Sequence, residues 1–403
     1  MGLQKLYVFG SDTKLLGRLE KRLDGYEFKY AKSYLDDHSA LALNPVRLPL
    51  VEKTFFAKFA GSEEGFTGIL SVFGDALPGA WGKAVLNAQA NRKLTPFEQL
   101  LENQRDRIGH LVFSEDMTFP VLTDSRSLPP FQWEDILDAK DEFERRKRFP
   151  PAFSALFKQG ASQGGARPKL SVIKNNQPYL AKLPTIQDYE NKAQIEHGTL
   201  ALAREVGIQT AESSLIKVRP TQDIFLTKRF DYTGQYKRPF LSMKALLAAD
   251  HCADVSYGDF ALALQRINGG KDSHEIFKRM LLNAMISNHD DHYLNHGVLW
   301  VDGQWRLSPA FDVVAGEGHR RDLAIRAGEY GAAPTEENLL SEHDKFSLTR
   351  TEAKDIFDQM KDTIAEKWEA VFSQNGVDDD VIQSISWAIL DGFDLPVQKN
   401  NGS

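Results

Sequence analysis

The sequence predicts an α+β protein with a strand-rich first half and a helical second half. Short β-like runs separated by turn signals fill residues 1 to about 120, and strand patterns with one helical stretch follow over residues 152–232. From residue 233 onward, apolar side chains recur at helical spacing, as in SHEIFKRMLLNAMISN and RTEAKDIFDQMKDTIAEKWEAVF. These two changes of pattern divide the chain into regions of different architecture.

Composition bounds the class of protein. The chain has 403 residues, of which 42% are hydrophobic and 26% charged, as in ordinary globular proteins. No apolar run is long enough for a membrane span, and the start, MGLQKLYVFG, has no signal core. The single cysteine, Cys252, excludes an internal disulfide framework and predicts a cytoplasmic location. A net charge of −7 argues against broad, unaided binding to nucleic acid.

Three regions and one linker are predicted along the chain. An N-terminal β-rich subdomain spans residues 1–120, and a linker spans 121–151, because DEFERRKRFPP is charged and ends in two prolines. Its basic run at 145–148 reads as a solvated helix face, with a phosphate or acidic-partner contact as the alternative. A strand-rich region with a glycine-rich loop spans 152–232, and a helical region spans 233–395.

A polar loop at residues 287–300, SNHDDHYLNHGVLW, holds a concentration of histidine, aspartate and asparagine side chains. It follows the helix HEIFKRMLLNAMI, whose apolar residues have the spacing of a buried helix. After it come VLWV, the turn pair Asp302-Gly303 and QWRLS, which together predict a β-hairpin. That hairpin leads to Asp312. The predicted order is buried helix, polar loop, hairpin, aspartate.

This order matches the requirements of phosphoryl transfer. A loop aspartate accepts the proton of the attacking hydroxyl, an asparagine five positions later binds Mg²⁺, and a second aspartate bridges metal and phosphates. Asp290, Asn295 and Asp312 have this spacing. A metal-dependent hydrolase using the HDDH run at 289–292, or a plain polar loop, remains an alternative, although four consecutive residues rarely converge on one ion.

A glycine-rich loop, GASQGGARPK at 160–169, could cradle phosphate. It lies between the strand-like runs FSALF and LSVI, and glycines let backbone N–H groups approach phosphate oxygens. The loop is not a Walker A sequence, because Ala166 stands where lysine is required. A flexible surface loop is the alternative.

A lysine follows in kinase order. A turn at Asn175-Asn176 leads into the strand PYLAKLP, which contains Lys182. The next helical pattern, QDYENKAQIEHGTLALAREVG, contains Glu190 and Glu196, two candidates to pair with Lys182 and direct it toward phosphates. A strand lysine by itself is usually a solvent-facing residue, but here it completes the set of loop, lysine, glutamate, Asp, Asn and Asp.

Together these motifs resemble a known family. GASQGGARPKL, LAKLP, LTKRFDY, NHDDHYLNHGVL and LSPAFDV look like the HipA family of serine/threonine-protein kinase toxins of type II toxin–antitoxin systems. EEGFTGILSVFGDALPGAWGK resembles the family's extra N-terminal subdomain. The resemblance covers about residues 40–320. It implies a two-lobed protein-kinase-like fold with an N-lobe, a helical C-lobe, and ATP and Mg²⁺ as cofactors.

The resemblance also implies roles for individual residues. Asp290 would be the catalytic aspartate, and Asn295 and Asp312 would bind the metal. Lys182 would contact the phosphates, with Glu196, the better aligned of the two glutamates, as its partner. Ser162 in the glycine-rich loop would be autophosphorylated, which switches such kinases off. The residues implied to contact the nucleotide are Gly164, Gly165, Ala166, Arg167, Pro168, Lys169, Lys182, Lys228, Arg229, Phe230, His292, Asn295 and Asp312.

The implied partners are a small helix-turn-helix antitoxin, DNA only through that antitoxin, and a protein substrate, which for some family members is an aminoacyl-tRNA synthetase. No membrane partner is expected. One position departs from the family pattern: Leu294 stands where Lys or Arg is usual, which removes a cation near the transferring phosphoryl group. A small-molecule kinase of the same fold, a metal-dependent hydrolase and a catalytically silent antitoxin-binding subunit remain alternatives.

Overall fold

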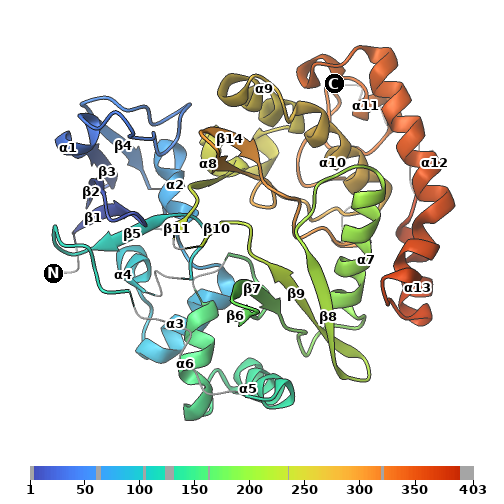
Figure 1. Ribbon diagram of the computed structural model, residues 1–403, viewed down its shortest axis with the longest axis horizontal. Coiled ribbons are helices and arrows are strands. Elements are labelled where there is room, and N and C mark those ends of the chain that lie inside the picture. Colours follow the sequence, from blue (N-terminus) through green and yellow to red (C-terminus); the bar gives the residue numbers. More distant parts are fainter. Residues whose placement is uncertain are drawn as a thin grey trace, which may run out of the picture. The chain divides into compact units, whose positions relative to one another are not determined.

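The protein is described by a computed structural model covering residues 4–59, 65–102, 106–122, 131–161, 164–234, 236–318 and 322–390 (Figure 1). Residue contacts divide the chain into two compact units. Unit 1 comprises Met1–Ala193, Glu212–Asp250 and Gly297–Asp302, and unit 2 comprises Gln194–Ala211, His251–His296 and Gly303–Ser403. Among the described residues, most strands lie in unit 1, and the longest helix, Arg350–Gln374, lies in unit 2. The predicted mixture of strand-rich regions and a helical C-terminal region is therefore observed.

The N-terminal part of unit 1 is built on an antiparallel five-stranded sheet with the order β4-β3-β2-β1-β5. Its strands are β1 (Lys5–Gly10), β2 (Leu15–Lys21), β3 (Gly25–Tyr30), β4 (Thr54–Lys58) and β5 (Leu111–Ser114). Buried aromatic rings on and beside this sheet, among them Phe28, Phe55 and Phe113, form its core. The helices of this region are α1 (Lys32–Leu35), α2 (Ser71–Gly74), α3 (Ala80–Ala90) and α4 (Pro96–Leu101).

A second antiparallel sheet in unit 1 has the order β6-β7-β9-β8. Its strands are β6 (Lys169–Lys174), β7 (Gln177–Lys182), β8 (Ser213–Arg219) and β9 (Gln222–Lys228). The predicted turn between β6 and β7 is confirmed, because Asn175 and Asn176 both adopt positive φ angles, 49° and 61°. Asparagine tolerates this conformation, so the turn fixes the pairing of the two strands.

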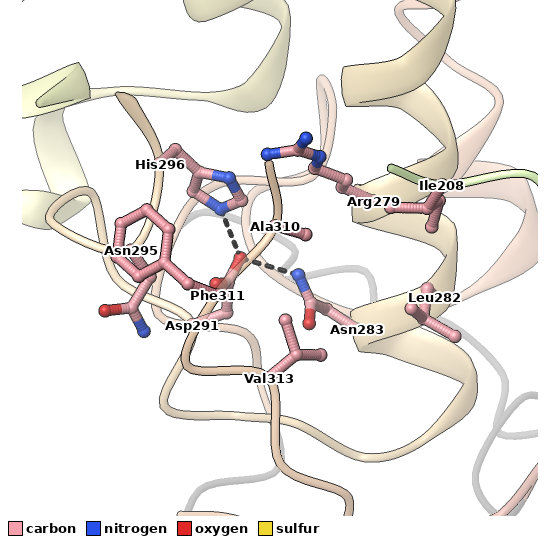
Figure 2. Close-up of a pocket in the computed structure, with 10 residues that line it drawn as sticks. All are labelled: Ile208, Arg279, Leu282, Asn283, Asp291, Asn295, His296, Ala310, Phe311 and Val313. Carbon is pink, nitrogen blue, oxygen red and sulfur yellow. Dashed lines mark hydrogen bonds and ion pairs between the residues drawn. The ribbon is translucent and has the colours of Figure 1, made fainter. Parts of the chain in front are cut away.

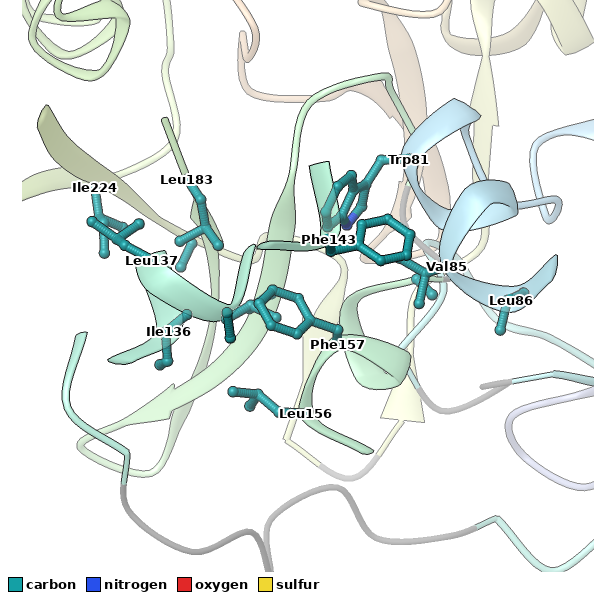
Figure 3. Close-up of a cluster of buried hydrophobic side chains, with 14 of the residues drawn as sticks. Trp81, Val85, Leu86, Ile136, Leu137, Phe143, Leu156, Phe157, Leu183 and Ile224 are labelled. Carbon is teal, nitrogen blue, oxygen red and sulfur yellow. The ribbon is translucent and has the colours of Figure 1, made fainter. Parts of the chain in front are cut away.

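Three helices cover one face of this second sheet: α3, α5 (Trp133–Arg146) and α6 (Pro151–Gly160). Figure 3 shows their side chains meeting those of the sheet, with Trp81, Phe143 and Phe157 in one hydrophobic cluster with Leu183 and Ile224. Because α5 lies inside residues 121–151, the segment expected to be a linker holds a packed helix, and the basic run 145–148 at its end is exposed.

The expectation that FSALF is a strand is wrong, since residues 153–157 lie in α6. Pro151 occupies the first helical position, where proline is favoured, and no residue of the segment is β-branched. Leu156 and Phe157 then fall on the buried side of the helix, three and four residues after Phe153.

Short elements complete unit 1 and join its N-terminal part to the region around residue 240. Asn44 Nδ2 donates to the carbonyl oxygen of Ala245 at 2.7 Å, and Ser242 N–H and Oγ–H donate to the carboxylate of Asp75 at 2.7 and 2.6 Å. The elements are β10 (Tyr232–Thr233), β11 (Tyr236–Lys237), β12 (Phe240–Ser242), α8 (Met243–Leu247) and β13 (Gly297–Val301).

Unit 2 is mainly helical. Helix α10 buries Ile276, Met280 and Leu281, as its spacing predicts, and α7 approaches α12 closely where Gly198 faces the ring of Phe372. The main helices are α7 (Lys192–Glu205), α9 (Tyr257–Asn268), α10 (Ser273–Met285), α12 (Arg350–Gln374) and α13 (Asp379–Ile385). The shorter elements are β14 (Gln304–Leu307), α11 (Glu336–Leu339) and the 3₁₀ turns His343–Phe346 and Ser386–Ala388.

Helix α7 begins later than the sequence pattern suggested. Glu190 was expected inside the helix but precedes its first residue, Lys192. The carboxylate of Asp188 accepts a hydrogen bond from the backbone N–H of Thr185 at 2.8 Å, which holds the preceding segment in a turn. Glu196, in contrast, lies inside α7 and is buried. No helix among the described residues is long and apolar enough to span a membrane.

Candidate active site

Two lysines share one face of the second sheet in unit 1. Lys169 at the start of β6 pairs with Lys182 at the end of β7 across the antiparallel ladder, and directly opposed residues lie on the same face. Their neighbours Leu170 and Ala181 belong to the core under α3, α5 and α6. Because side chains alternate along a strand, both lysines lie on the face opposite these helices. This face therefore carries two cationic side chains at the same end of the β6–β7 pair.

The glycine-rich loop closes over the first of these lysines. Lys169 is buried, its ammonium group donates to the carbonyl oxygen of Gly164, and a Cβ on Gly165 would lie 2.5 Å from Lys169 Nζ. Gly165 has a φ of 89°, which favours glycine. The loop residues Gly164 to Ala166 are exposed. The loop backbone is therefore open to a ligand while its flank is fixed by Lys169.

The remaining residues predicted around this loop have defined contacts. Arg167 forms an ion pair with Asp188, and Pro168 is buried with its carbonyl oxygen accepting from Leu183 N–H at 2.8 Å. Lys182 is half-buried, with its ammonium 5.4 Å from the ring centroid of Phe225. Glu196 belongs to unit 2 and Lys182 to unit 1, and their pairing stays a prediction. Ser162 lies outside the described residues.

Helix α3 approaches the glycine-rich loop backbone to backbone. A Cβ on Gly79, the residue preceding α3, would overlap the backbone of Gly165, and a Cβ on Gly82 would overlap the carbonyl oxygen of Ala161. Only glycine permits such close contact. This support of the loop was missed from the sequence, where the only signal was the two glycines of PGAWG.

Three of the residues implied to contact the nucleotide, Lys228 to Phe230, lie at the end of β9 and directly after it. Lys228 Nζ lies 3.5 Å from Glu212 Oε1, and Phe230 is half-buried. The guanidinium of Arg229 is buried and bonds both carboxylate oxygens of Asp231 at 3.0 and 2.7 Å, as well as the carbonyl oxygens of residues 106 and 107. The Arg229 side chain is thus fully engaged in joining the N-terminal part of unit 1 to the second sheet, and a nucleotide would meet the backbone here.

In unit 2, the polar loop begins where α10 ends. Ser287 has a φ of 52° and its hydroxyl donates to the carbonyl oxygen of Ala388 at 2.8 Å, which turns the chain sharply out of the helix. His289 N–H donates to the carbonyl oxygen of Glu317 at 2.8 Å. Asp290, the next residue, is exposed. The predicted aspartate is therefore exposed directly after a segment that two hydrogen bonds hold in place.

Carboxylates gather around Asp290. Partial burial raises its pKa, and the nearby carboxylates of Glu317, Asp312 and Asp291 raise it further, while His292 lowers it. Asp312 is half-buried and adopts a φ of 59°, an uncommon conformation for a residue with a side chain. Glu317 was missed from the sequence, where the glycines on both sides of it marked only a turn. Asp290 therefore lies in the electrostatic field of three other carboxylates.

Asn295 lies further along the same loop, five residues after Asp290. It is buried, its N–H donates to the carbonyl oxygen of His292 at 2.8 Å, and it lines a cavity of about 10 Å³ with Phe311 and Val313, the neighbours of Asp312 (Figure 2). The predicted residues Asp290, His292, Asn295 and Asp312 are thus brought into one region of unit 2.

The HDDH run does not form a metal cluster of its own. Asp291 is only 1% exposed and accepts hydrogen bonds from Tyr257, Asn283 and His296, whereas Asp290 is exposed. Within the described part of the chain, no group of three or more His, Cys, Asp and Glu residues is placed to hold a metal ion. The donors present fit Mg²⁺ instead, which takes one or two protein oxygen ligands and completes its shell with water and substrate phosphates.

Comparison with known proteins identifies the fold. A solved complex from Shewanella oneidensis MR-1, of the toxin–antitoxin proteins HipA and HipB with operator DNA, contains a chain that superposes with a TM-score of 0.68 at 16% identity, covering 94% of both chains. A Haemophilus influenzae protein named "Putative kinase" is 26% identical over 182 residues, 39% of this chain. The chain spans about half the length of that relative, 53%.

Family matches cover most of the chain. Residues 6–114 match the HipA N-terminal domain, and residues 161–368 match the HipA-like C-terminal domain. The second match alone includes the glycine-rich loop, both lysines and the polar loop of unit 2. The predicted α+β, kinase-like fold with an extra N-terminal subdomain is confirmed. This chain belongs to the HipA family.

Proposed function

We propose that the protein is an ATP- and Mg²⁺-dependent serine/threonine protein kinase that acts as the toxin of a toxin–antitoxin pair. The observation that carries the proposal is the contrast between two sets of residues. Lys169 and Lys182 are opposed on one sheet face in unit 1, and Asp290, Asp312 and Glu317 gather in unit 2. A magnesium nucleotide satisfies both sets, since phosphates bind cations and Mg²⁺ binds carboxylates.

Each residue then has a role drawn from its chemistry. The two lysines and the loop backbone at Gly164 and Gly165 hold phosphate oxygens. Asn295 and Asp312 supply oxygen ligands for Mg²⁺, which when bound neutralises phosphate charge. Asp290 accepts the proton of the attacking hydroxyl, the role of the loop aspartate in protein kinases. Glu196 is proposed to orient Lys182.

Leu294 bears on how fast this reaction runs. Its side chain is 43% exposed in the polar loop and offers an apolar surface where the family usually has a cation. A phosphoryl group in transfer is stabilised by positive charge. Slow turnover is therefore expected, and a catalytically silent antitoxin-binding subunit is the alternative that this residue favours.

The resemblance to the family also supports a partner. The Shewanella oneidensis complex contains HipB and operator DNA, and a small DNA-binding antitoxin is proposed for this chain by analogy. The net charge of −7 fits a protein that reaches DNA only through a partner. In gel-shift experiments at physiological salt, the isolated chain should leave operator-length DNA free. Tight, salt-resistant binding by the chain alone would contradict the assignment.

Intact mass after incubation with ATP and Mg²⁺ tests the proposed reaction. A kinase that autophosphorylates on Ser162 gains the mass of one phosphoryl group, and Ser162→Ala does not gain it at that site. Phosphate release without mass gain would favour a hydrolase, transfer to a small acceptor would favour a small-molecule kinase, and neither change would favour a silent subunit. Peptide mapping that finds phosphate only elsewhere would leave Ser162 an ordinary loop residue.

A further inference from the structure

We propose that Asp291 and His296 are positioning residues that set the separation of the base Asp290 and the magnesium ligand Asn295. This inference rests on the proposed function. His296 Nε2 donates to Asp291 Oδ2 at 2.6 Å, which we call the Asp291–His296 bridge. Asp291 directly follows Asp290, and His296 directly follows Asn295. The bridge therefore closes the loop between the two functional residues at its base.

The bridge is anchored to two helices of unit 2. The same oxygen of Asp291, Oδ2, also accepts from the hydroxyl of Tyr257 at the start of α9 and from Asn283 Nδ2 on α10 at 2.7 Å. Figure 2 shows the hydrogen bonds from His296 and Asn283 meeting at one carboxylate oxygen of Asp291. Three donors on one carboxylate oxygen fix the position of that carboxylate, because moving it would break all three hydrogen bonds.

Burial strengthens these hydrogen bonds, so that losing one would destabilise the folded state. Asp291 is 1% exposed, and His296 and Asn283 are equally shielded, at 3% and 2%. Charge-assisted hydrogen bonds gain strength where water is excluded. The Tyr257 ring packs edge-on against the His296 ring, with the centroids 5.5 Å apart. The loop between Asp290 and Asn295 is thus tied at both ends to a rigid support.

The remaining contacts of His296 indicate that its role is this one bond. Its other ring nitrogen, Nδ1, is buried without a hydrogen-bond partner among the described residues. A histidine kept for packing alone would not require a buried nitrogen aimed at a carboxylate. Groups that orient metal ligands are sensitive positions, and their loss commonly reduces metal affinity or activity by about 10–100-fold.

Three variants separate positioning from folding. His296→Leu removes the donor, and His296→Gln keeps an amide nitrogen that can reach Asp291. Tyr257→Phe removes one donor of the anchor and retains the ring packing. His343→Leu is the matched control, because His343 also makes one hydrogen bond in unit 2, from Nδ1 to the carbonyl oxygen of Leu348 at 2.8 Å. All are compared at a temperature where circular dichroism shows each variant to be folded.

Amide hydrogen exchange over residues 289–297 is the first measurement, because it requires no activity. His296→Leu should lose protection there, while His296→Gln and His343→Leu should keep it. If His296→Leu does not fold, Tyr257→Phe must show a smaller loss in the same segment. Unchanged protection in both His296→Leu and Tyr257→Phe would overturn the proposal, whether or not the protein proves to be a kinase.

The magnesium dependence of phosphoryl transfer is the second measurement. For His296→Leu, the half-saturating Mg²⁺ concentration should rise or turnover fall by about 10–100-fold, with recovery in His296→Gln. A merely structural role would lower the melting temperature and leave the magnesium dependence of the folded enzyme unchanged, which would also overturn the proposal. If the wild-type protein transfers no phosphate at all, the proposed function fails, and the exchange result still decides the bridge.

Discussion

The two units present opposite chemistry. Unit 1 pairs two lysines, Lys169 and Lys182, on one sheet face beside a glycine-rich loop. In unit 2, Asp312 and Glu317 lie near Asp290, and burial together with these carboxylates raises the pKa of Asp290. We propose that the first group binds phosphate and the second a divalent cation. A magnesium nucleotide contains both a phosphate and a divalent cation.

The two units also hold their groups differently. In unit 2 the loop around Asp290 is fixed by the Asp291–His296 bridge, whose partners are five residues apart. In unit 1 the support is long-range: Arg229 bonds the carbonyl oxygen of Asp106, 123 residues earlier, and Gly79 lies against Gly165. The N-terminal domain of the family is therefore part of the support of the proposed phosphate loop.

The largest expected effect tests the acidic group. Asp290→Asn keeps the side-chain shape and removes the base, so phosphoryl transfer should fall roughly 10²–10⁴-fold while ATP still binds. Asp302→Asn is the control, because Asp302 is an exposed turn residue whose φ of 48° asparagine tolerates. Rates from intact mass against time check this. Wild-type turnover in Asp290→Asn would remove the assigned base.

A second effect tests the long-range support of unit 1. Arg229→Met leaves the buried carboxylate of Asp231 without its ion-pair partner, and breaking such a pair costs about 3–5 kcal/mol. Arg229→Lys should recover little, because an ammonium cannot bond both oxygens as a guanidinium does. Chemical denaturation measures the change in the free energy of unfolding. Arg146→Met is the control, because it removes the exposed ion pair of Arg146 with Glu142. Equal stability of Arg229→Met and Arg146→Met would show that the buried cluster is dispensable.

A third effect tests the contact between α3 and the glycine-rich loop. Gly82→Ala should favour the helix by propensity, yet its Cβ would overlap the carbonyl oxygen of Ala161. We expect a net destabilisation of about 1–3 kcal/mol, as for other overpacked sites, together with weaker ATP binding. Gly65→Ala is the control, since a Cβ there meets nothing within 4 Å. Stabilisation by Gly82→Ala would mean that the helix and the loop are not in close contact.

The smallest effect concerns pH. Burial raises the pKa of Asp75 to about 6, despite its hydrogen bonds from Ser242. The folded state then binds a proton more tightly than the unfolded state, so the stability contributed by this group is present below pH 3.8 and lost as pH rises through 6. Asp75→Asn should flatten the pH dependence of unfolding between these values. Parallel curves for both proteins would contradict the shift.

The sequence predicted the local features of the site and missed the long-range ones. The order of α10, polar loop, turn and Asp312 follows from periodicity and spacing within 40 residues, which is why it could be read directly. The run FSALF predicts a strand but forms a helix, because a short apolar run fits both patterns. Contacts such as Arg229 with Asp106 and Gly82 with Ala161 depend on how distant segments pack, and no local pattern encodes them.

Calorimetric titration of ATP with and without Mg²⁺ tests the central claim most directly. The cations of unit 1 should bind phosphate in either condition, and the oxygen ligands of unit 2 should act only through Mg²⁺. Lys182→Met should therefore weaken ATP binding both with and without Mg²⁺, whereas Asp312→Asn should remove only the gain that Mg²⁺ provides. If Asp312→Asn weakens ATP binding equally in the absence of Mg²⁺, or Lys182→Met leaves it unchanged, the account is contradicted.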